Sequence, residues 1–130
     1  MFLRPGMFAP NTRSWWAPQI RAGHDDVRGP YAAAPRAPIH ERDIAAVAVR
    51  ASHEDGHAGA DYVLTGPQSL SQLEQISTIG GVIGRRLRME EISPDEARRE
   101  CLGGMPAFVA NMLLGAWAAA IGQPALVFRP

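Results

Sequence analysis

Apolar residues recur every three or four positions in three stretches of the chain, and this spacing is the period of an α-helix packed on one side. Residues 43–51, 71–84 and 106–121 each show it. The positions that share a face are Ile44, Val47, Ala48 and Ala51 in the first stretch, Leu73, Ile76, Ile79 and Ile83 in the second, and Phe108, Met112, Gly115, Ala116 and Ala119 in the third. We expect the face of the first helix to contact the core.

Polar and small residues mark where helices begin and end. Ser71 with Glu74 three residues later is a capping box, and Gly84 is placed to stop the helix that follows. Gly80 and Gly81 lie inside this helix and weaken it by about 1 kcal/mol each relative to alanine. The run from Ser93 to Glu96, with proline at the first helical position, predicts another helix that continues to about residue 102.

A short helix is also expected near the start of the chain. Asn11 or Thr12 can cap it, it carries two consecutive tryptophans, and Pro18 and Gly23 are expected to end it. Residues 24–38 are rich in alanine and proline, so we interpret them as a loop-rich, hairpin-like excursion.

Three segments have the pattern of strands. Residues 1–5 are interpreted as the end of a sheet strand that Pro5 terminates, and residues 61–65 as a buried strand because of their β-branched and aromatic content. Residues 86–90 alternate polar and apolar, which is typical of a strand near a sheet edge. Strands that alternate with helices predict an α/β fold with an incomplete parallel sheet, since the strands are too few for a doubly wound domain.

Composition narrows the classes of function. The chain has 130 residues, 46% of them apolar, which is enough for one domain. Thirteen basic and thirteen acidic residues cancel, so we expect no nucleic-acid or membrane partner driven by charge. Every basic residue is an arginine, which excludes a Schiff-base lysine from these residues. A single cysteine, Cys101, and the lack of a leader pattern favour the cytoplasm.

Other candidate features have simpler structural interpretations. His53 and His57 have the spacing of zinc ligands on a helix, but glycines place His57 in a loop, so we predict no metal site. Cys101 fits a small buried residue better than a nucleophile. His40 and Asp43 lie at a helix start, where capping accounts for both. Residues 101–128 carry no charge, which suits a buried or exposed apolar helix better than a membrane span.

Three motifs in order point to a family: LRPGMFAPN at residues 3–11, APIHERDIA at 37–45 and YVLTGP at 62–67. In this spacing the chain resembles the C-terminal half of the NmrA-like atypical short-chain dehydrogenase/reductases, which are NAD(P)-binding relatives of nucleotide-sugar epimerases. The resemblance continues through residues 71–86 and 92–97. It implies the C-terminal part of a Rossmann-like fold, with residues 1–130 as a single domain fragment and residues 103–130 as an apolar C-terminal helix and tail.

The resemblance also implies where a cofactor lies. The family's glycine-rich turn and its Tyr-x-x-x-Lys pair are not found in the 130 residues, so we assign no catalytic residue. By resemblance, the loop of Pro5, Gly6, Met7 and Phe8 follows a parallel strand and approaches the nicotinamide of NAD(P). Asn11 matches the asparagine of the family's Phe-x-x-Asn pattern. These five residues are the expected cofactor-binding positions.

Four further residues are expected to line the pocket of a small-molecule substrate, although each also suits a plain core: Trp15, Tyr31, Met105 and Phe108. The implied function is hydride transfer between NAD(P)H and a carbonyl or quinone-like acceptor in the full-length protein, with the fragment inactive alone. The alternative is a regulatory or protein-interaction module that senses NAD(P) without turnover. A further alternative is self-association through the sheet edge or the C-terminal helix.

Overall fold

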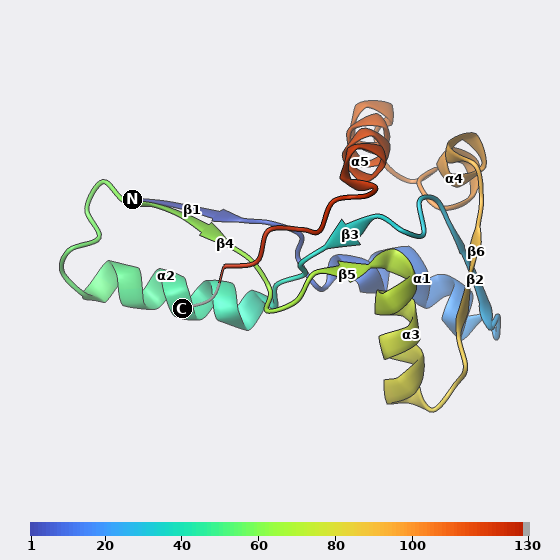
Figure 1. The fold of residues 1–130 in the computed structure, drawn as a ribbon, viewed down its shortest axis with the longest axis horizontal. Helices are drawn as coiled ribbons and strands as arrows, with labels where there is room; N and C mark the ends of the chain where they lie inside the picture. Colours follow the sequence, from blue (N-terminus) through green and yellow to red (C-terminus); the bar gives the residue numbers. More distant parts are fainter. Residues whose placement is uncertain (129–130) are drawn as a thin grey trace.

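The computed structural model describes residues 1–128 and is elongated, with helices flanking short strands along its length (Figure 1). The elements in chain order are β1 (Phe2–Pro5), α1 (Asn11–Arg21), β2 (Asp26–Gly29), β3 (Pro35–Arg36), α2 (Glu41–His53), β4 (Asp61–Leu64), β5 (Leu70–Ser71), α3 (Gln72–Ile83), β6 (Arg88–Glu91), α4 (Pro94–Glu100) and α5 (Ala107–Ala120). Mixed helices and parallel strands confirm the α/β class. The last two residues of the 103–130 segment lie outside the described residues.

The strands form three separate pairs. β1 and β4 are parallel, with Phe2 opposite Asp61 and Pro5 opposite Leu64. β2 and β6 are also parallel, whereas β3 and β5 form a short antiparallel pair. In Figure 1 the β1–β4 pair lies beside α2 at one end of the molecule, the β2–β6 pair lies at the other end, and β3 and β5 lie between them. The predicted parallel sheet is therefore present as two short parallel pairs.

Most of the buried apolar residues form two clusters in the part of the molecule that holds α1, α3, α4 and α5. One cluster joins α1, β2 and α3 to the segment before β6, through Trp16, Val27, Ile76 and Leu87. The other joins α4 and α5, through Ala34, Ile92, Ala97, Leu102, Ala110, Leu114 and Trp117. Trp15 packs against both clusters, so the two form one continuous core.

Helix ends follow the sequence signals in the second half of the chain. The Ser71 hydroxyl accepts a hydrogen bond from the Glu74 backbone N–H at 3.1 Å, and the Glu74 carboxylate accepts one from the Ser71 N–H at 2.7 Å. Gly84 ends α3 with a φ of 73° in the left-handed region. Ser93 caps α4, accepting from the Glu96 N–H at 3.2 Å. The capping box and both helix starts are confirmed.

Gly80 has a packing role that the sequence analysis did not predict. A Cβ at this position would lie 2.5 Å from the carbonyl oxygen of Arg85 and 3.1 Å from the backbone nitrogen of Leu87. A Cβ at Gly81 would meet nothing within 4 Å. The absence of a side chain at Gly80 therefore lets α3 approach the segment that leads into β6, whereas Gly81 only weakens the helix.

The first helix differs from the prediction at its N-terminus and at Pro18, whereas Gly23, with a φ of 93°, follows its last turn as expected. Its N-terminal flank is Pro10, with no side-chain cap from Asn11 or Thr12. Pro18 lies within the helix, which continues to Arg21. The Gln19 side chain donates to the Arg28 carbonyl at 2.9 Å and accepts from the Arg28 N–H at 2.8 Å. We attribute the continuation of the helix past the proline to this pair of bonds, which hold its last turn against β2.

The prediction of a hairpin-like excursion over residues 24–38 is wrong. This region contains β2 and β3, and each pairs with a strand more than thirty residues away, β6 and β5 respectively. Local sequence patterns carry little information about such distant partners. A hairpin is recognised by the turn that joins its two strands, and neither of these strand pairs is joined by a turn. The strand at 61–65 ends at Leu64 and is not fully buried, because Val63 is 48% exposed and β4 pairs only with β1 among the described strands.

The apolar face predicted for the last helix is the exposed one. Phe108 is 73% exposed and Met112 is 63% exposed, whereas Ala110, Leu114 and Trp117 are buried. α5 is apolar on all sides, so the spacing of its apolar residues does not determine which side faces the core. In the part of the chain that the structure describes, no helix is both long enough and apolar enough to cross a membrane.

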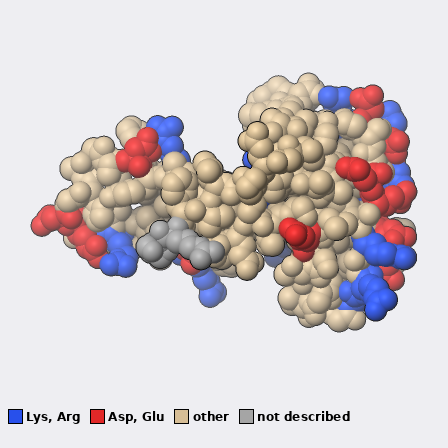
Figure 2. All heavy atoms as spheres, viewed as in Figure 1, with Lys and Arg blue, Asp and Glu red and all other residues tan. Residues whose placement is uncertain are grey.

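Ion pairs connect β2 to β6 and α4. The Arg28 guanidinium contacts Glu90 at 2.8 Å, Glu96 at 3.2 Å and Glu100 at 2.9 Å, so one cation joins β2 to β6 and α4. The hydrogen bond from Arg28 lowers the pKa of Glu100 below its ordinary value. Figure 2 shows the acidic and basic groups mainly at the two ends of the molecule in this view, with a largely uncharged surface between them.

Candidate functional site

Three chain segments meet at the carboxyl ends of β1 and β4. The Gly6 N–H donates to the carbonyl of Leu64 at 2.9 Å, which extends the parallel pairing one residue past β1. The Ile39 N–H donates to the carbonyl of Met7 at 2.9 Å, and the Ala9 N–H donates to the carbonyl of Ile39 at 2.8 Å. Residues 6–9, 37–39 and 64–66 therefore lie side by side. Ligands of parallel α/β sheets bind outside this end of the strands.

Gly66 is required for this meeting of segments. Its N–H donates to the carbonyl of Ala37 at 3.0 Å, and a Cβ built on it would lie 1.8 Å from the carbonyl oxygen of Pro38. No side chain fits in that space. The glycine of the TGP sequence thus has a steric role, since it lets the loop before α2 lie directly against the end of β4.

A surface groove of about 290 Å³ opens where these segments meet the C-terminal tail. Residues from four parts of the chain line it: Gly6, Met7, Pro35, Arg36, Ala37, Thr65, Ala120, Gln123, Pro124, Ala125 and Leu126. Two hydrogen bonds hold the tail in place. The Ala125 N–H donates to the Ser69 hydroxyl and the Phe128 N–H donates to the Thr65 hydroxyl, both at 2.9 Å. The groove is the candidate site.

The size and polarity of the groove limit what it can hold. Its volume is at the lower end of the range for pockets that hold drug-sized ligands, about 300–1,000 Å³. A flat ring with its substituents fits in that space, but a whole dinucleotide is too large. Arg36 is the one charged residue among the lining residues, and most of the others are apolar. The groove therefore suits one flat, largely apolar ring, such as the nicotinamide end of a cofactor or an aromatic acceptor, and it offers a single cation at its wall.

The structure brings some of the expected cofactor-binding residues to this site. Gly6 and Met7 line the groove, and Pro5 is the last residue of β1 just before them. Phe8 pairs through its backbone with Ile39, and its side chain is 41% exposed. Asn11 is the exposed first residue of α1, and its N–H donates to the Phe8 carbonyl at 3.0 Å.

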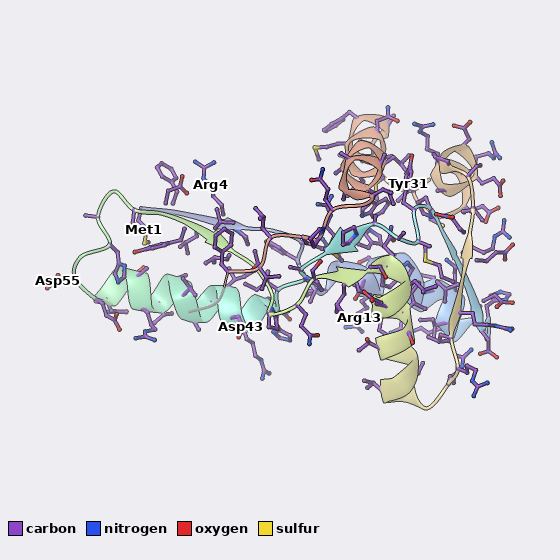
Figure 3. All side chains as sticks on the ribbon, viewed as in Figure 1. Met1, Arg4, Arg13, Tyr31, Asp43 and Asp55 are labelled. Atoms are coloured by element: carbon purple, nitrogen blue, oxygen red, sulfur yellow. The ribbon has the colours of Figure 1, made fainter. Side chains whose placement is uncertain are left out.

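The four expected pocket residues lie elsewhere. Trp15, Tyr31 and Met105 pack against the buried cluster of α4 and α5. Figure 3 shows Tyr31 near α5, away from the part of the molecule where β1 and β4 end. Trp15 makes edge-to-face contacts with Trp16 and Trp117 at centroid distances of 6.2 and 5.3 Å. Phe108 lies on the exposed face of α5.

The cavity next to Trp15 is too small for a ligand. It lies between the two tryptophans of α1, Gly29, Cys101 and Trp117, and its volume is about 10 Å³. That is about the space of one water molecule. Trp15 therefore fits a core residue better than the wall of a substrate pocket.

The remaining candidate groups have structural partners. The Cys101 thiol donates to the Arg28 carbonyl at 3.5 Å, and burial raises its pKa, so it stays protonated near neutral pH. His40 caps α2 by accepting from the Arg42 N–H at 3.1 Å. His57 bonds the Tyr62 hydroxyl at 2.7 Å from a loop. Within residues 1–128, no group of three or more potential metal ligands is found.

Several residues of the groove were not predicted. From the sequence alone, Thr65 is expected in a strand, Arg36 in a loop and residues 123–126 in an apolar tail. Pro35 and Pro38 flank Arg36, and proline within a sheet is confined to edge strands and strand ends. These prolines are the one local signal that could indicate a short edge strand there. No sequence signal links the tail to Thr65, because that contact joins residues 63 positions apart.

Comparison with curated proteins finds relatives that are reductases. The chain is 42% identical over 113 residues to the (4-alkanoyl-5-oxo-2,5-dihydrofuran-3-yl)methyl phosphate reductase of Streptomyces griseus subsp. griseus, an alignment covering 87% of this chain and 39% of that enzyme. It is 40% identical over 76 residues to the NAD(P)H azoreductase of Xenophilus azovorans, covering 58% of this chain and 27% of the azoreductase. The chain thus spans well under half the length of these relatives. No family model matches the sequence.

Solved structures show the same fold. The NADPH-dependent quinone oxidoreductase of Escherichia coli in complex with NADPH matches with a TM-score of 0.72 and 22% identity, over 92% of this chain and 44% of that one. The triphenylmethane reductase of Citrobacter sp. in complex with NADP(H) matches with a TM-score of 0.69 and 15% identity, over 90% and 41% of the two chains. At these levels of identity, the structural matches show a shared fold and nothing further.

The sequence relatives and the shared fold agree with the motifs at residues 3–11, 37–45 and 62–67. The matched structures share a Rossmann-like fold, of which this chain corresponds to a part. The chain is thus similar to part of the NAD(P)H-dependent reductases, in agreement with its resemblance to the NmrA-like family.

Proposed function

We propose that this chain forms the acceptor side of an NAD(P)H-dependent reductase and that the groove at the ends of β1 and β4 is where the nicotinamide meets the acceptor. The reaction is hydride transfer to a carbonyl, quinone or similar small molecule. The observation that carries the proposal is the position of the groove, at the carboxyl ends of two parallel strands and lined by Gly6 and Met7.

The residues present fit the nicotinamide end of the cofactor. Gly6 has no side chain and is exposed, so a ring can approach the backbone there. Met7 and Ala37 give apolar walls, and a flexible thioether adapts to a flat ring. The bound nicotinamide supplies the hydride. In this arrangement the chain orients the acceptor and excludes water, while the tail at residues 123–126 covers one side of the reacting groups.

The names of the relatives indicate the range of acceptors. They act on a furanone phosphate and on azo compounds, and the structural neighbours reduce quinones and triphenylmethane dyes. We extend to this chain only what these acceptors share, which is a conjugated system that accepts two electrons. The apolar lining of the groove suits such a conjugated group.

A second candidate function is binding of NAD(P) without turnover. The composition of the groove favours it: the described lining residues include no histidine, carboxylate, tyrosine or cysteine, and Thr65 carries the one hydroxyl group among them. A site with few free polar groups binds a ring without supplying a proton. In this case the chain would act as a sensor of the cofactor.

A hybrid enzyme separates the two functions. The aligned segment of the Streptomyces griseus reductase is replaced by the corresponding residues of this chain, and NADPH binding and oxidation are measured with a panel of quinone, azo and lactone acceptors. We expect the hybrid to bind NADPH and to oxidise it with at least one acceptor. Binding without oxidation of any acceptor would favour the sensor.

Two controls accompany the hybrid. Far-ultraviolet circular dichroism must show that it folds like the parent enzyme. The 130-residue chain tested alone is expected to bind NADPH only weakly, because the groove accommodates one end of the dinucleotide. Tight NADPH binding by the 130-residue chain would contradict this assignment of the groove.

A further inference from the structure

Arg36 stands apart from the other arginines of the chain. Three arginines in the described residues are half-buried: Arg28, Arg36 and Arg85. Arg28 binds three glutamates, and Arg85 binds Asp25 at 2.7 Å together with two backbone carbonyls. Arg36 forms no ion pair with any described residue and no side-chain hydrogen bond to one. The fully exposed arginines need no partner, since water solvates them.

A half-buried guanidinium without a partner is unfavourable. Partial burial removes hydrating water from the charge, and proteins usually compensate with a carboxylate or with several carbonyl oxygens. The chain provides this compensation at Arg28 and Arg85. A cation left uncompensated at the wall of a groove is available to an anion that enters the groove.

The rest of the groove restricts what kind of anion this is. Met7, Ala37, Ala120, Pro124 and Leu126 give apolar walls around the arginine. The chain from residue 101 to residue 128 carries no charge at all, so the tail contributes none. A small, fully hydrated anion would gain little from such walls. An anionic group attached to a flat apolar body would contact both the guanidinium and the walls.

We propose that Arg36 binds the carboxylate, sulfonate or phosphate group of a ligand whose apolar ring lies in the groove. The inference rests on the proposed function, in which that ligand is the acceptor. A phosphate of the cofactor would offer Arg36 the same chemistry, so the experiment includes an arm for each source. Arg36 is thus a residue that determines substrate specificity, selecting acceptors with a single acidic substituent.

The test measures ligand binding to the 130-residue chain, without any turnover. The probes are 2-naphthalenesulfonate and its uncharged analogue 2-naphthalenesulfonamide, titrated while amide chemical shifts are followed by NMR. We expect the sulfonate to shift the amides of residues 6–7, 36–37 and 65, and to bind more tightly than the sulfonamide. Arg36→Gln should weaken sulfonate binding about tenfold, as expected for loss of one charge-assisted hydrogen bond, and leave sulfonamide binding unchanged.

Two variants serve as controls. Arg86→Gln removes the same charge from a fully exposed arginine outside the groove, and it should leave sulfonate binding within twofold. Arg36→Lys keeps the charge but not the fork of donors, so it should restore part of the affinity. The amide spectrum of each variant must keep the dispersion of the parent, which shows that the fold is intact.

The outcomes are distinct. Any of three results would overturn the proposal. Arg36→Gln and Arg86→Gln could lose sulfonate affinity equally, Arg36→Gln could weaken the sulfonate and the sulfonamide equally, or the sulfonate could show no saturable binding. A parallel titration with inorganic phosphate and with NADP⁺ identifies which molecule supplies the anionic group. If Arg36→Gln weakens NADP⁺ binding, the arginine binds the cofactor. If Arg36→Gln leaves NADP⁺ binding unchanged, the arginine binds the acceptor. Failure of the proposed reductase function would instead appear as an absence of NADPH oxidation by the hybrid.

Discussion

Substituting Gly66 tests whether the candidate site is built as the structure shows. In Gly66→Ala the new Cβ would lie 1.8 Å from the Pro38 carbonyl oxygen, whereas ordinary contact begins near 3.4 Å. The loop before α2 must therefore move away from the end of β4 by more than an ångström. That movement also breaks the hydrogen bond from the Gly66 N–H to the Ala37 carbonyl.

The expected loss of stability follows from these two effects. Forcing a methyl group into a packed site costs about 1–3 kcal/mol, and losing one backbone hydrogen bond costs about 1 kcal/mol. Together they lower the free energy of unfolding by about 2–4 kcal/mol. For a chain of this length that corresponds to a fall of roughly 8–16 °C in Tm. The groove should open at the same time, because Ala37 and Thr65 both line it.

Gly6→Ala is the matched control at the same site. A Cβ at Gly6 would lie 3.7 Å from the Leu64 carbonyl oxygen, an ordinary van der Waals contact. Its stability should stay within about 0.5 kcal/mol of the parent. Urea denaturation followed by circular dichroism gives both free energies, and 2-naphthalenesulfonate titration reports on the groove. If Gly66→Ala proves as stable as Gly6→Ala, the loop does not lie against the strand end and the argument fails.

Three further predictions concern other parts of the molecule. Gly80→Ala should lower the free energy of unfolding by about 1–3 kcal/mol, because the new Cβ would push α3 away from the segment that leads into β6. Gly81→Ala should raise the free energy of unfolding by up to about 1 kcal/mol. Thermal unfolding compares the two variants, and equal effects would refute the close packing at Gly80. Because Arg28 lowers the pKa of Glu100 in the folded state, the stabilisation is present above the pKa of an unfolded glutamate, about 4.3, and is lost as the pH falls through the folded value. Urea titrations should therefore show Glu100→Gln less stable than the parent at pH 7, with the difference shrinking as the pH is lowered below about 4, and a constant difference would exclude this linkage. We propose that the exposed face of α5 associates with a second copy, so light scattering should show concentration-dependent dimers that Met112→Arg abolishes, and a monomer at all concentrations would refute this.

Local signals predicted the helices better than the strands. The capping box at Ser71, and the serine before α4 with the proline at its first position, depend on atoms three or four residues apart, so the sequence carries the whole signal. β2, β3 and β5 are only two to four residues long and pair with distant segments, which leaves no local pattern to detect. On α5 the apolar residues extend all round, so their spacing does not identify the buried side.

The candidate site was predictable only in part, for a similar reason. The motif around Gly6 and Met7 identifies the strand end by resemblance, and the structure places both residues in the groove. Arg36 and Thr65 are ordinary residues whose roles depend on which segments lie nearby. The expected pocket aromatics illustrate the converse, since Trp15 has the residue type of a pocket wall but fills the core.

The walls of the groove are far apart in sequence, and this affects the order in which parts of the protein fold. The groove's residues come from near both ends of the described chain, from 6–7 to 120–126, and two other segments between them must be in place before the groove exists. Contacts between residues so far apart form late in folding, after helices such as α3 that close locally. In a refolding experiment the far-ultraviolet circular dichroism of the helices should therefore recover before the chain regains its capacity to bind a ligand. During that interval the helices would be formed while the protein is still unable to function.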